Sequence, residues 1–177
     1  MKKLLQYILL STGLLFSFMA VAGGVYQKPA DFINEAFSGQ PPKAKVLWLD
    51  KTLKKQLSDI LGHPYRGMRI RYWPQDKKTA WILEEIGKEK PITTGIIINN
   101  GKIEQIKVLV FRESRGWEVR HDFFTGQFKQ AGLKPDNSLD RHIDNISGAT
   151  LSVRALKKLA TIALLLDATV QQKQARK

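Results

Sequence analysis

The longest helical pattern of the chain follows the stretch Asp144-Asn145-Ile146-Ser147-Gly148-Ala149-Thr150-Leu151-Ser152. No Gly or Pro interrupts residues 151–170, and apolar side chains recur there at helical spacing. Polar side chains fall on the opposite side, so the pattern predicts an amphipathic helix. The apolar positions are Leu151, Ala155, Leu159, Ile162, Leu166 and Val170, and the polar ones are Arg154, Lys157, Lys158 and Thr161.

The small residues before this helix favour contact with an anion. Ser147 is a suitable N-cap, because its hydroxyl can accept a hydrogen bond from a first-turn N–H. Gly148 and Ala149 carry little side chain, so a ligand can approach the free N–H groups closely. These donors and the positive end of the helix dipole favour a phosphate, which the Thr150 hydroxyl could carry as an ester. The alternative is that Ser147 simply caps a core helix and Thr150 is an ordinary first-turn residue.

The pattern Asp144-x-x-Ser147-Gly148-Ala149-Thr150-x-Ser152 resembles the flavinylation motif of the FMN-binding domain family. That family includes the C and G subunits of sodium-pumping and Rnf-type redox complexes. In it, a separate flavin transferase that uses FAD and magnesium joins the motif threonine to the FMN phosphate. The resemblance therefore implies covalent FMN on Thr150, with Asp144, Ser147, Gly148 and Ala149 completing the recognised motif.

A second match lies upstream, at Glu113-Ser114-Arg115-Gly116-Trp117. Family members often show E-T-P-G at this place, followed by an aromatic helix. Glu113 and Gly116 agree with that pattern, whereas Ser114 and Arg115 replace Thr and Pro. The resemblance covers roughly residues 90 to 165 and implies that Glu113 and Gly116 belong to the FMN site.

The N-terminal residues have the layout of a secretory signal. Lys2 and Lys3 precede an apolar run over residues 4–21, and Ala20-Val21-Ala22 supplies an A-x-A cleavage site. We expect cleavage before Gly23, the alternative being an uncleaved membrane anchor, since the run is near the length that spans a bilayer. The expected location is the periplasm or the outer face of the cytoplasmic membrane. The absence of Cys excludes disulfides, thiolate metal sites and iron–sulfur clusters.

The charge of the chain favours anionic partners. Lys and Arg number 29 against 16 Asp and Glu, a formal net charge of +13. We expect no nucleic-acid partner, because the basic residues are spread along the chain and no nucleic-acid motif is present. The expected partners are the flavin transferase and a membrane-bound electron donor or acceptor. The three His residues lack metal-site spacing, so no metal is expected.

Local patterns predict the remaining elements. A short helix starts at Pro29 and ends before the Gly-Gln-Pro-Pro run 39–42, and residues 46–49 form a strand. Asp50 caps a helix over residues 51–61, which Gly62 ends. Residues 65–111 have period two and predict antiparallel strands over 68–73, 79–86, 93–98 and 103–111, the last of them central. A hairpin is expected at residues 99–102, and a helix over 117–129, interrupted at Gly126, places Phe124 and Phe128 in the core.

These elements predict an α+β fold: an antiparallel sheet with helices packed on one face, forming a single domain after an N-terminal signal peptide. The expected segments are a signal peptide 1–22, an N-terminal part 23–64, an FMN-binding domain 65–170 and a basic tail 171–177. We interpret the protein as an exported flavoprotein that carries electrons through FMN on Thr150, rather than as a stand-alone enzyme. The alternative is a non-redox basic module that binds anionic lipid or polymer.

Overall fold

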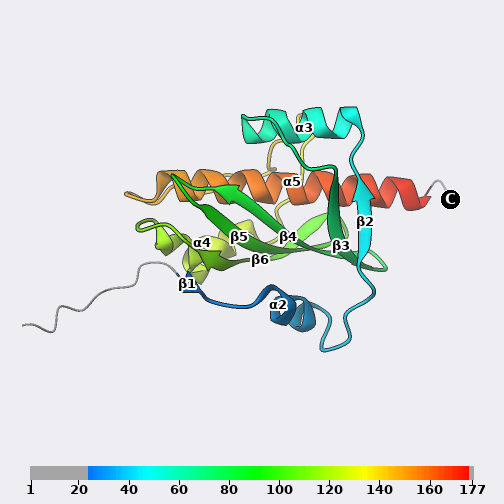
Figure 1. The fold of residues 1–177 in the computed structure, drawn as a ribbon, viewed down its shortest axis with the longest axis horizontal. Helices are drawn as coiled ribbons and strands as arrows, with labels where there is room; N and C mark the ends of the chain where they lie inside the picture. Colours follow the sequence, from blue (N-terminus) through cyan, green and yellow to red (C-terminus); the bar gives the residue numbers. More distant parts are fainter. Residues whose placement is uncertain (1–23, 176–177) are drawn as a thin grey trace, which may run out of the picture.

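Within residues 24–175, the part of the chain that the computed structural model describes, six antiparallel strands form one sheet (Figure 1). Their spatial order is β1-β6-β5-β4-β3-β2. The strands are β1 (Gly24–Val25), β2 (Lys45–Trp48), β3 (Arg69–Gln75), β4 (Lys78–Ile86), β5 (Pro91–Asn99) and β6 (Lys102–Phe111). The α-helices are α2 (Pro29–Ala36), α3 (Lys51–Leu61), α4 (Asp122–Thr125) and α5 (Thr150–Ala175). The predicted signal peptide lies outside these residues.

The predicted strands and the predicted hairpin are confirmed. Asn100 and Gly101 both have positive φ, at 50° and 72°, as a two-residue hairpin turn between β5 and β6 requires. β3 runs past Pro74, which the sequence pattern had placed in the connection, and Pro74 is tolerated because it lies next to the end of the strand. The sequence pattern predicts β6 as the central strand, but the structure places it second from one edge, beside the two-residue β1. The two middle strands of the sheet are β5 and β4.

Helices cover both faces of the sheet, as Figure 1 shows. The predicted arrangement holds for α3 and α5, which share one face and enclose the larger core, in which Leu57, Trp81 and Leu156 are fully buried. The first helix, α2, packs on the opposite face, where Phe32 forms a smaller core with Leu109. The fold is therefore α+β with an antiparallel sheet, as expected, and carries one additional helix on the second face.

The two long helices, α3 and α5, follow the sequence prediction closely. In α3, Asp50 accepts a hydrogen bond from the Leu53 N–H at 2.8 Å, and Gly62 ends the helix with a φ of 73°, as predicted. The predicted apolar stripe of α5 is buried from Ala155 to Val170, whereas its first residue, Leu151, is 40% exposed. The helix continues to Ala175, so residues 171–175 of the predicted tail are helical. No helix within residues 24–175 is long and apolar enough to cross a bilayer.

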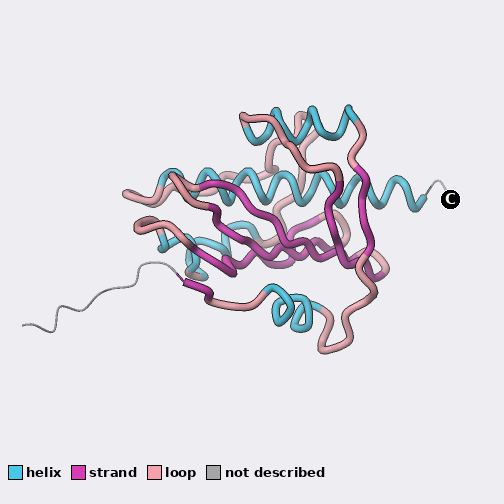
Figure 2. Tube along the Cα trace, in the orientation of Figure 1, coloured by secondary structure: helices cyan, strands magenta, loops and turns pink. Residues whose placement is uncertain are grey.

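The helix predicted over residues 117–129 is broken into three short turns: η1 (Trp117–Arg120), α4 and η2 (Gly126–Phe128). The break after η1 occurs at His121, whose extended backbone (ψ 150°) interrupts the helical hydrogen bonds. Phe124 and Phe128 are fully buried, with ring centroids 5.5 Å apart, so their predicted core role is confirmed. An irregular segment then leads from η2 to α5 (Figure 2).

Candidate functional site

The helix α5 begins one residue after Ala149. The Val153 N–H donates to the Ala149 carbonyl at 2.9 Å, and the Ala149 N–H donates to the Ile146 carbonyl at 3.0 Å. Ala149 therefore occupies the N-cap position and Thr150 is the first helical residue. The predicted cap at Ser147 is wrong, because Gly148 has a φ of 82° and turns the chain before the helix starts.

The first turn of α5 presents unused hydrogen-bond donors. Within the described residues, the backbone N–H groups of Thr150, Leu151 and Ser152 have no acceptor. The Thr150 side chain is exposed, and its hydroxyl oxygen accepts a hydrogen bond from Asn145 Nδ2 at 3.2 Å. Asn145 stands at an unspecified position of the motif, which is why sequence reasoning missed it. Free donors at a helix N-terminus form a site for an anion.

The upstream loop touches this turn through Gly116. Gly116 has a φ of 83°, and a Cβ built there would lie 2.5 Å from Ser152 Oγ and 3.5 Å from Ala149 Cα. Only glycine satisfies both the backbone conformation and this close approach. The two stretches that the sequence singled out are thus brought together at the start of α5.

Glu113 holds the turn between β4 and β5. Its Oε1 accepts hydrogen bonds from the N–H groups of Lys88, Glu89 and Lys90 at 2.6, 2.6 and 2.8 Å. Burial by itself raises the pKa of Glu113, but these three donors outweigh burial and hold the pKa below its ordinary value. The geometry gives Glu113 a structural task close to Gly116, and its predicted contact with the cofactor stays a prediction.

A basic groove opens beside Thr150, between α5, the end of α3 and the segment that precedes α5. Its volume of about 660 Å³ lies within the roughly 300–1,000 Å³ of small-molecule sites. The lining includes four Arg or Lys side chains and no carboxylate. The residues that line it are Ile60, Asn137, Ser138, Leu139, Arg141, His142, Ile143, Asn145, Thr150, Val153, Arg154, Lys157, Lys158 and Thr161.

Two of the groove cations are available to a ligand. Arg154 and Lys157 have no ion pair or hydrogen bond through their side chains in the described part of the chain. Arg154 stands four residues after Thr150, so it is the next side chain on the same helical face. Arg141 instead donates to the Lys129 and Gln130 carbonyls. The polar face of the predicted helix already contained this signal, since it places Arg154 and Lys157 in line with Thr150.

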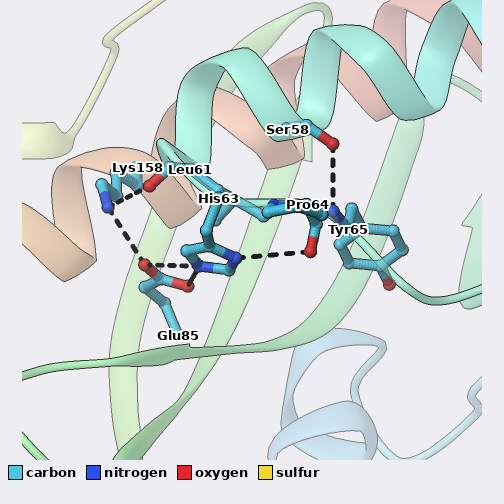
Figure 3. Close-up of polar contacts among 7 residues, drawn as sticks. All are labelled: Ser58, Leu61, His63, Pro64, Tyr65, Glu85 and Lys158. Atoms are coloured by element: carbon cyan, nitrogen blue, oxygen red, sulfur yellow. Dashed lines mark hydrogen bonds and ion pairs between the residues drawn. The ribbon is translucent and has the colours of Figure 1, made fainter.

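The network in Figure 3 holds Lys158, one of the side chains that line the groove. The buried carboxylate of Glu85, on β4, accepts from Lys158 Nζ at 3.1 Å and lies 3.1 Å from His63 Nε2. Lys158 also donates to the carbonyl of Leu61, at the end of α3. These contacts tie α5 to α3 and β4, and they occupy the charge of Lys158.

Asp144 and Ser147 point away from this framework. The Asp144 side chain is 77% exposed, and its Oδ1 lies 3.5 Å from His142 Nε2. The backbone N–H of Asp144 donates to Gln127 Oε1 at 2.8 Å, which anchors the segment to η2. Ser147 and Gly148 are exposed, and nothing lies within 4 Å of a Cβ built at Gly148. These motif residues are accessible to a partner.

An aromatic cluster surrounds the Gly116 loop. Arg120 lies over the rings of Tyr26 and Trp117, at 4.4 and 4.9 Å from their centroids. His121 packs edge-on against Trp117, and Phe123, 65% exposed, stacks on His121.

Residues 24–175 contain no group of three or more metal-ligating side chains of the His, Cys, Asp or Glu type.

An α+β domain whose longest helix starts with free N–H donors beside a carboxylate-free basic groove is a domain suited to a phosphorylated ligand. Residues 87–165 match the model of the FMN-binding domain family, and this part of the chain belongs to that family. The chain is therefore an FMN-binding protein. A search of curated proteins and a search of solved structures found no match.

The residues at the start of α5 fit the phosphate end of FMN. Three unpaired N–H donors lie beside Arg154 and Lys157, so a dianion there meets both hydrogen-bond donors and cations. The match also spans Glu113 and Gly116, in agreement with the second stretch of resemblance. The predicted site residues Ala149, Gly148, Ser147 and Asp144 directly precede Thr150 in the chain, but of the predicted site residues Thr150 alone is among those that line the groove.

Proposed function

We propose that the protein is an electron carrier whose FMN is joined by a phosphoester to Thr150. The observation that supports this most directly is the Thr150 hydroxyl, exposed at the mouth of a basic groove and beside three free backbone donors. Bound FMN supplies one- and two-electron redox chemistry, which no side chain of this Cys-free chain offers.

In the proposed attachment, the Thr150 oxygen attacks the FMN-side phosphorus of FAD. The Oγ–P bond forms as the pyrophosphate P–O bond breaks, AMP leaves, and the hydroxyl proton passes to solvent or to a base of the flavin transferase. Asn145 donates to the Thr150 oxygen, which leaves the hydroxyl proton free to depart. The side chains of Asp144 and Ser147 are exposed and therefore available for recognition by the magnesium-dependent transferase.

After attachment, residues of the chain keep the ester in place. The free N–H groups of the first turn and the side chains of Arg154 and Lys157 neutralise a phosphate on Thr150. Lys158 also lines the groove, but its charge is already paired with Glu85. Positive charge beside a flavin also favours its reduced, anionic form.

Export and a membrane-bound electron donor or acceptor complete the proposal. The signal-like layout of residues 1–22 supports a periplasmic location, or one on the outer face of the cytoplasmic membrane. A covalent bond is useful there, because a dissociated FMN would be lost where no pool replaces it. The competing non-redox interpretation expects a colourless protein in which Thr150 is unmodified.

The test compares Thr150→Val with Thr161→Val in cells that also produce the transferase. Valine keeps the shape of threonine and removes the hydroxyl, so Thr150→Val should fold but carry no covalent flavin. Thr161 lines the same groove, but its hydroxyl donates to the Lys157 carbonyl at 2.9 Å, so Thr161→Val should stay flavinylated. Intact mass and flavin fluorescence after denaturing electrophoresis measure the outcome. A wild-type protein with a bare Thr150, or a flavinylated Thr150→Val, would overturn the proposal.

A further inference from the structure

The edge strand β2 and its neighbour β3 expose apolar side chains far from Thr150. Val46 and Trp48 point outward from β2 and are 44% and 62% exposed. In Figure 1, β2 forms the edge of the sheet opposite β1, while α2 covers a more central part of the lower face. The outer face of β2 and β3 is therefore left uncovered within the described residues.

A hollow of about 490 Å³ lies on this face. Val46, Trp73 and Ile82 provide apolar walls, and Arg69 and Arg71 add two guanidinium groups. Trp73 and Ile82 are half-buried against the small core beneath α2, so the hollow continues the apolar surface of that core. We call Val46, Trp48, Arg69 and Arg71, together with the hollow, the β2–β3 surface. It combines apolar walls with guanidinium groups that can bind an anion.

The positive charge on the β2–β3 surface is not neutralised by the protein. Arg71 has no ion pair or hydrogen bond through its side chain among the described residues, and Arg69 only stacks over Trp48, at 5.7 Å from the ring centroid. Glu84 of β4, the carboxylate on the same sheet face, is engaged by Arg112 at 3.6 Å and by the Thr93 hydroxyl.

The charge in the surrounding sequence has the same sign. Residues 40–75 contain eight Lys or Arg and two Asp, so their net charge is 8 − 2 = +6 of the +13 of the whole chain. About a fifth of the sequence thus contributes nearly half of the charge. Arg69 and Arg71 share the sheet face of Trp48, whereas Lys51, Lys54 and Lys55 belong to α3, on the other face. The occupant of this surface must be anionic as well as apolar.

We propose that the β2–β3 surface docks the protein onto a membrane rich in anionic phospholipid. Trp48 suits the level of the headgroups, where an indole ring has an apolar body and a polar edge. Arg69 and Arg71 pair with lipid phosphates, while their stems and the walls of the hollow contact the first methylenes of the acyl chains. An acidic protein partner would match the charge as well, but lipid also accounts for apolar groups that project between the cations.

Docking in this way leaves the candidate flavin site accessible. A groove beside β2 is also lined by Val170, Lys173 and Gln174, so the β2 edge lies against the C-terminal end of α5. Thr150 is twenty residues earlier on the same helix, about 30 Å along its axis. The proposal does not depend on the flavin, because it concerns the opposite end of the helix.

The test measures co-sedimentation of the full chain with vesicles of phosphatidylglycerol and, separately, of phosphatidylcholine. Each neutralised cation near an anionic surface is worth about a fivefold gain in binding, so Arg69→Glu/Arg71→Glu should weaken binding to phosphatidylglycerol by about thirtyfold or more. The matched control is Lys129→Glu/Lys134→Glu, which makes the same change in net charge at exposed residues elsewhere, and it should bind nearly as wild type. Residues 1–23 are common to all these proteins and cancel in the comparison.

A second variant, Trp48→Ala, guards against a folding defect in the double mutant. It should unfold at the wild-type temperature, lose several-fold in binding, and lose part of the blue shift of tryptophan emission that lipid induces. The proposal fails if wild type does not prefer phosphatidylglycerol, or if both charge-reversed variants weaken equally. It also fails if neither Arg69→Glu/Arg71→Glu nor Trp48→Ala changes binding, in which case an acidic protein is the remaining candidate for this surface.

Discussion

The two ends of α5 differ in whether their polar groups have hydrogen-bond partners. At the start, the N–H groups of Thr150, Leu151 and Ser152 have no acceptor in the described part of the chain. Near the other end, the buried Asp167 accepts hydrogen bonds from the Thr79 hydroxyl at 2.7 Å and from Gln171 Nε2 at 3.3 Å. Trp81 Nε1 in turn donates to the Thr79 hydroxyl at 2.9 Å.

Within α5, the region around Asp167 therefore serves stability, whereas the first turn is suited to binding a ligand. Around Asp167 the chain satisfies its own polar groups, because a buried group without a partner costs about 1–3 kcal/mol. Thr150 and Leu151 are exposed and Thr150 lines the basic groove, so leaving their N–H groups free costs little and keeps a site for an anion. Four substitutions, ordered by expected effect, test the contrast.

The largest effect is expected from Gly116→Ala, which forces a methyl group against Ser152 Oγ at a φ of 83°. The left-handed backbone costs about 1–2 kcal/mol and overpacking adds about 1–3, so unfolding free energy should fall by roughly 3 kcal/mol. Urea unfolding measures it. Gly148→Ala is the matched control, since it has the same backbone strain without the contact and should lose only about 1 kcal/mol. Equal losses would show that the junction with α5 contributes nothing.

Glu113→Gln should lower the free energy of unfolding by about 2 kcal/mol at pH 7, because a charged acceptor of three N–H groups becomes neutral. The pKa of Glu113 is depressed in the folded protein, so its stabilisation is present above the unfolded-state pKa and is lost as the pH falls through the folded-state pKa. The difference between wild type and variant should therefore shrink in acid, as followed by thermal unfolding from pH 7 to pH 3. A difference that stays constant over this range would contradict the role of the charge.

Arg154→Gln should slow covalent flavin attachment to Thr150 about five- to tenfold, with stability unchanged, since Arg154 is exposed and unpaired one helical turn from Thr150. The rate of flavin incorporation with FAD, magnesium and transferase measures it. Lys173→Gln, at the far end of α5, removes the same charge and should have no effect. A similar slowing in both variants would reduce the effect to net charge alone.

The smallest effect is expected from Asp167→Asn, at the satisfied end. Burial raises the pKa of Asp167 above its ordinary value, and the hydrogen bonds from Thr79 and Gln171 oppose the rise without cancelling it. The folded state therefore binds the proton more tightly than the unfolded state, and the carboxyl group costs stability as the pH rises from the unfolded-state pKa toward the folded-state pKa. Asp167→Asn should be up to about 1 kcal/mol more stable than wild type at pH 8, and the gain should vanish near pH 3. A variant that is destabilised at pH 8 would show that the ionised carboxylate is needed.

Most of the fold could be predicted because its signals are local. Alternation of apolar side chains defines the strands, and Asp50, Gly62 and the pair Asn100-Gly101 mark helix ends and the hairpin, where each residue type has a specific backbone or capping role. The helix over residues 117–129 was predicted as one element because Phe124 and Phe128 have helical spacing. The extended backbone at His121 arises from tertiary packing, which spacing does not encode.

The sequence predicted the motif residues of the candidate site but not their three-dimensional surroundings. The resemblance supplied Thr150 and Gly116, and the structure adds that Gly116 lies against Ala149 and Ser152. The hydrogen bond from Asn145 and the groove with its free Arg154 depend on how segments distant in sequence meet, as does the Glu85 network that fixes Lys158. Ser147 was misjudged as the cap because residue preference does not reveal where Gly148 turns the chain.

The contact between Gly116 and the first turn of α5 joins parts of the chain that are made at different times. Gly116 leaves the ribosome 33 residues before Ala149, and the strands that position its loop come earlier still. An incompletely synthesised or misfolded chain has the same residues around Thr150 but lacks the contact between Gly116 and the first turn of α5. A flavin transferase that recognises the assembled turn would thus modify only folded chains. Covalently bound flavin would then indicate that the sheet and α5 had packed together before attachment.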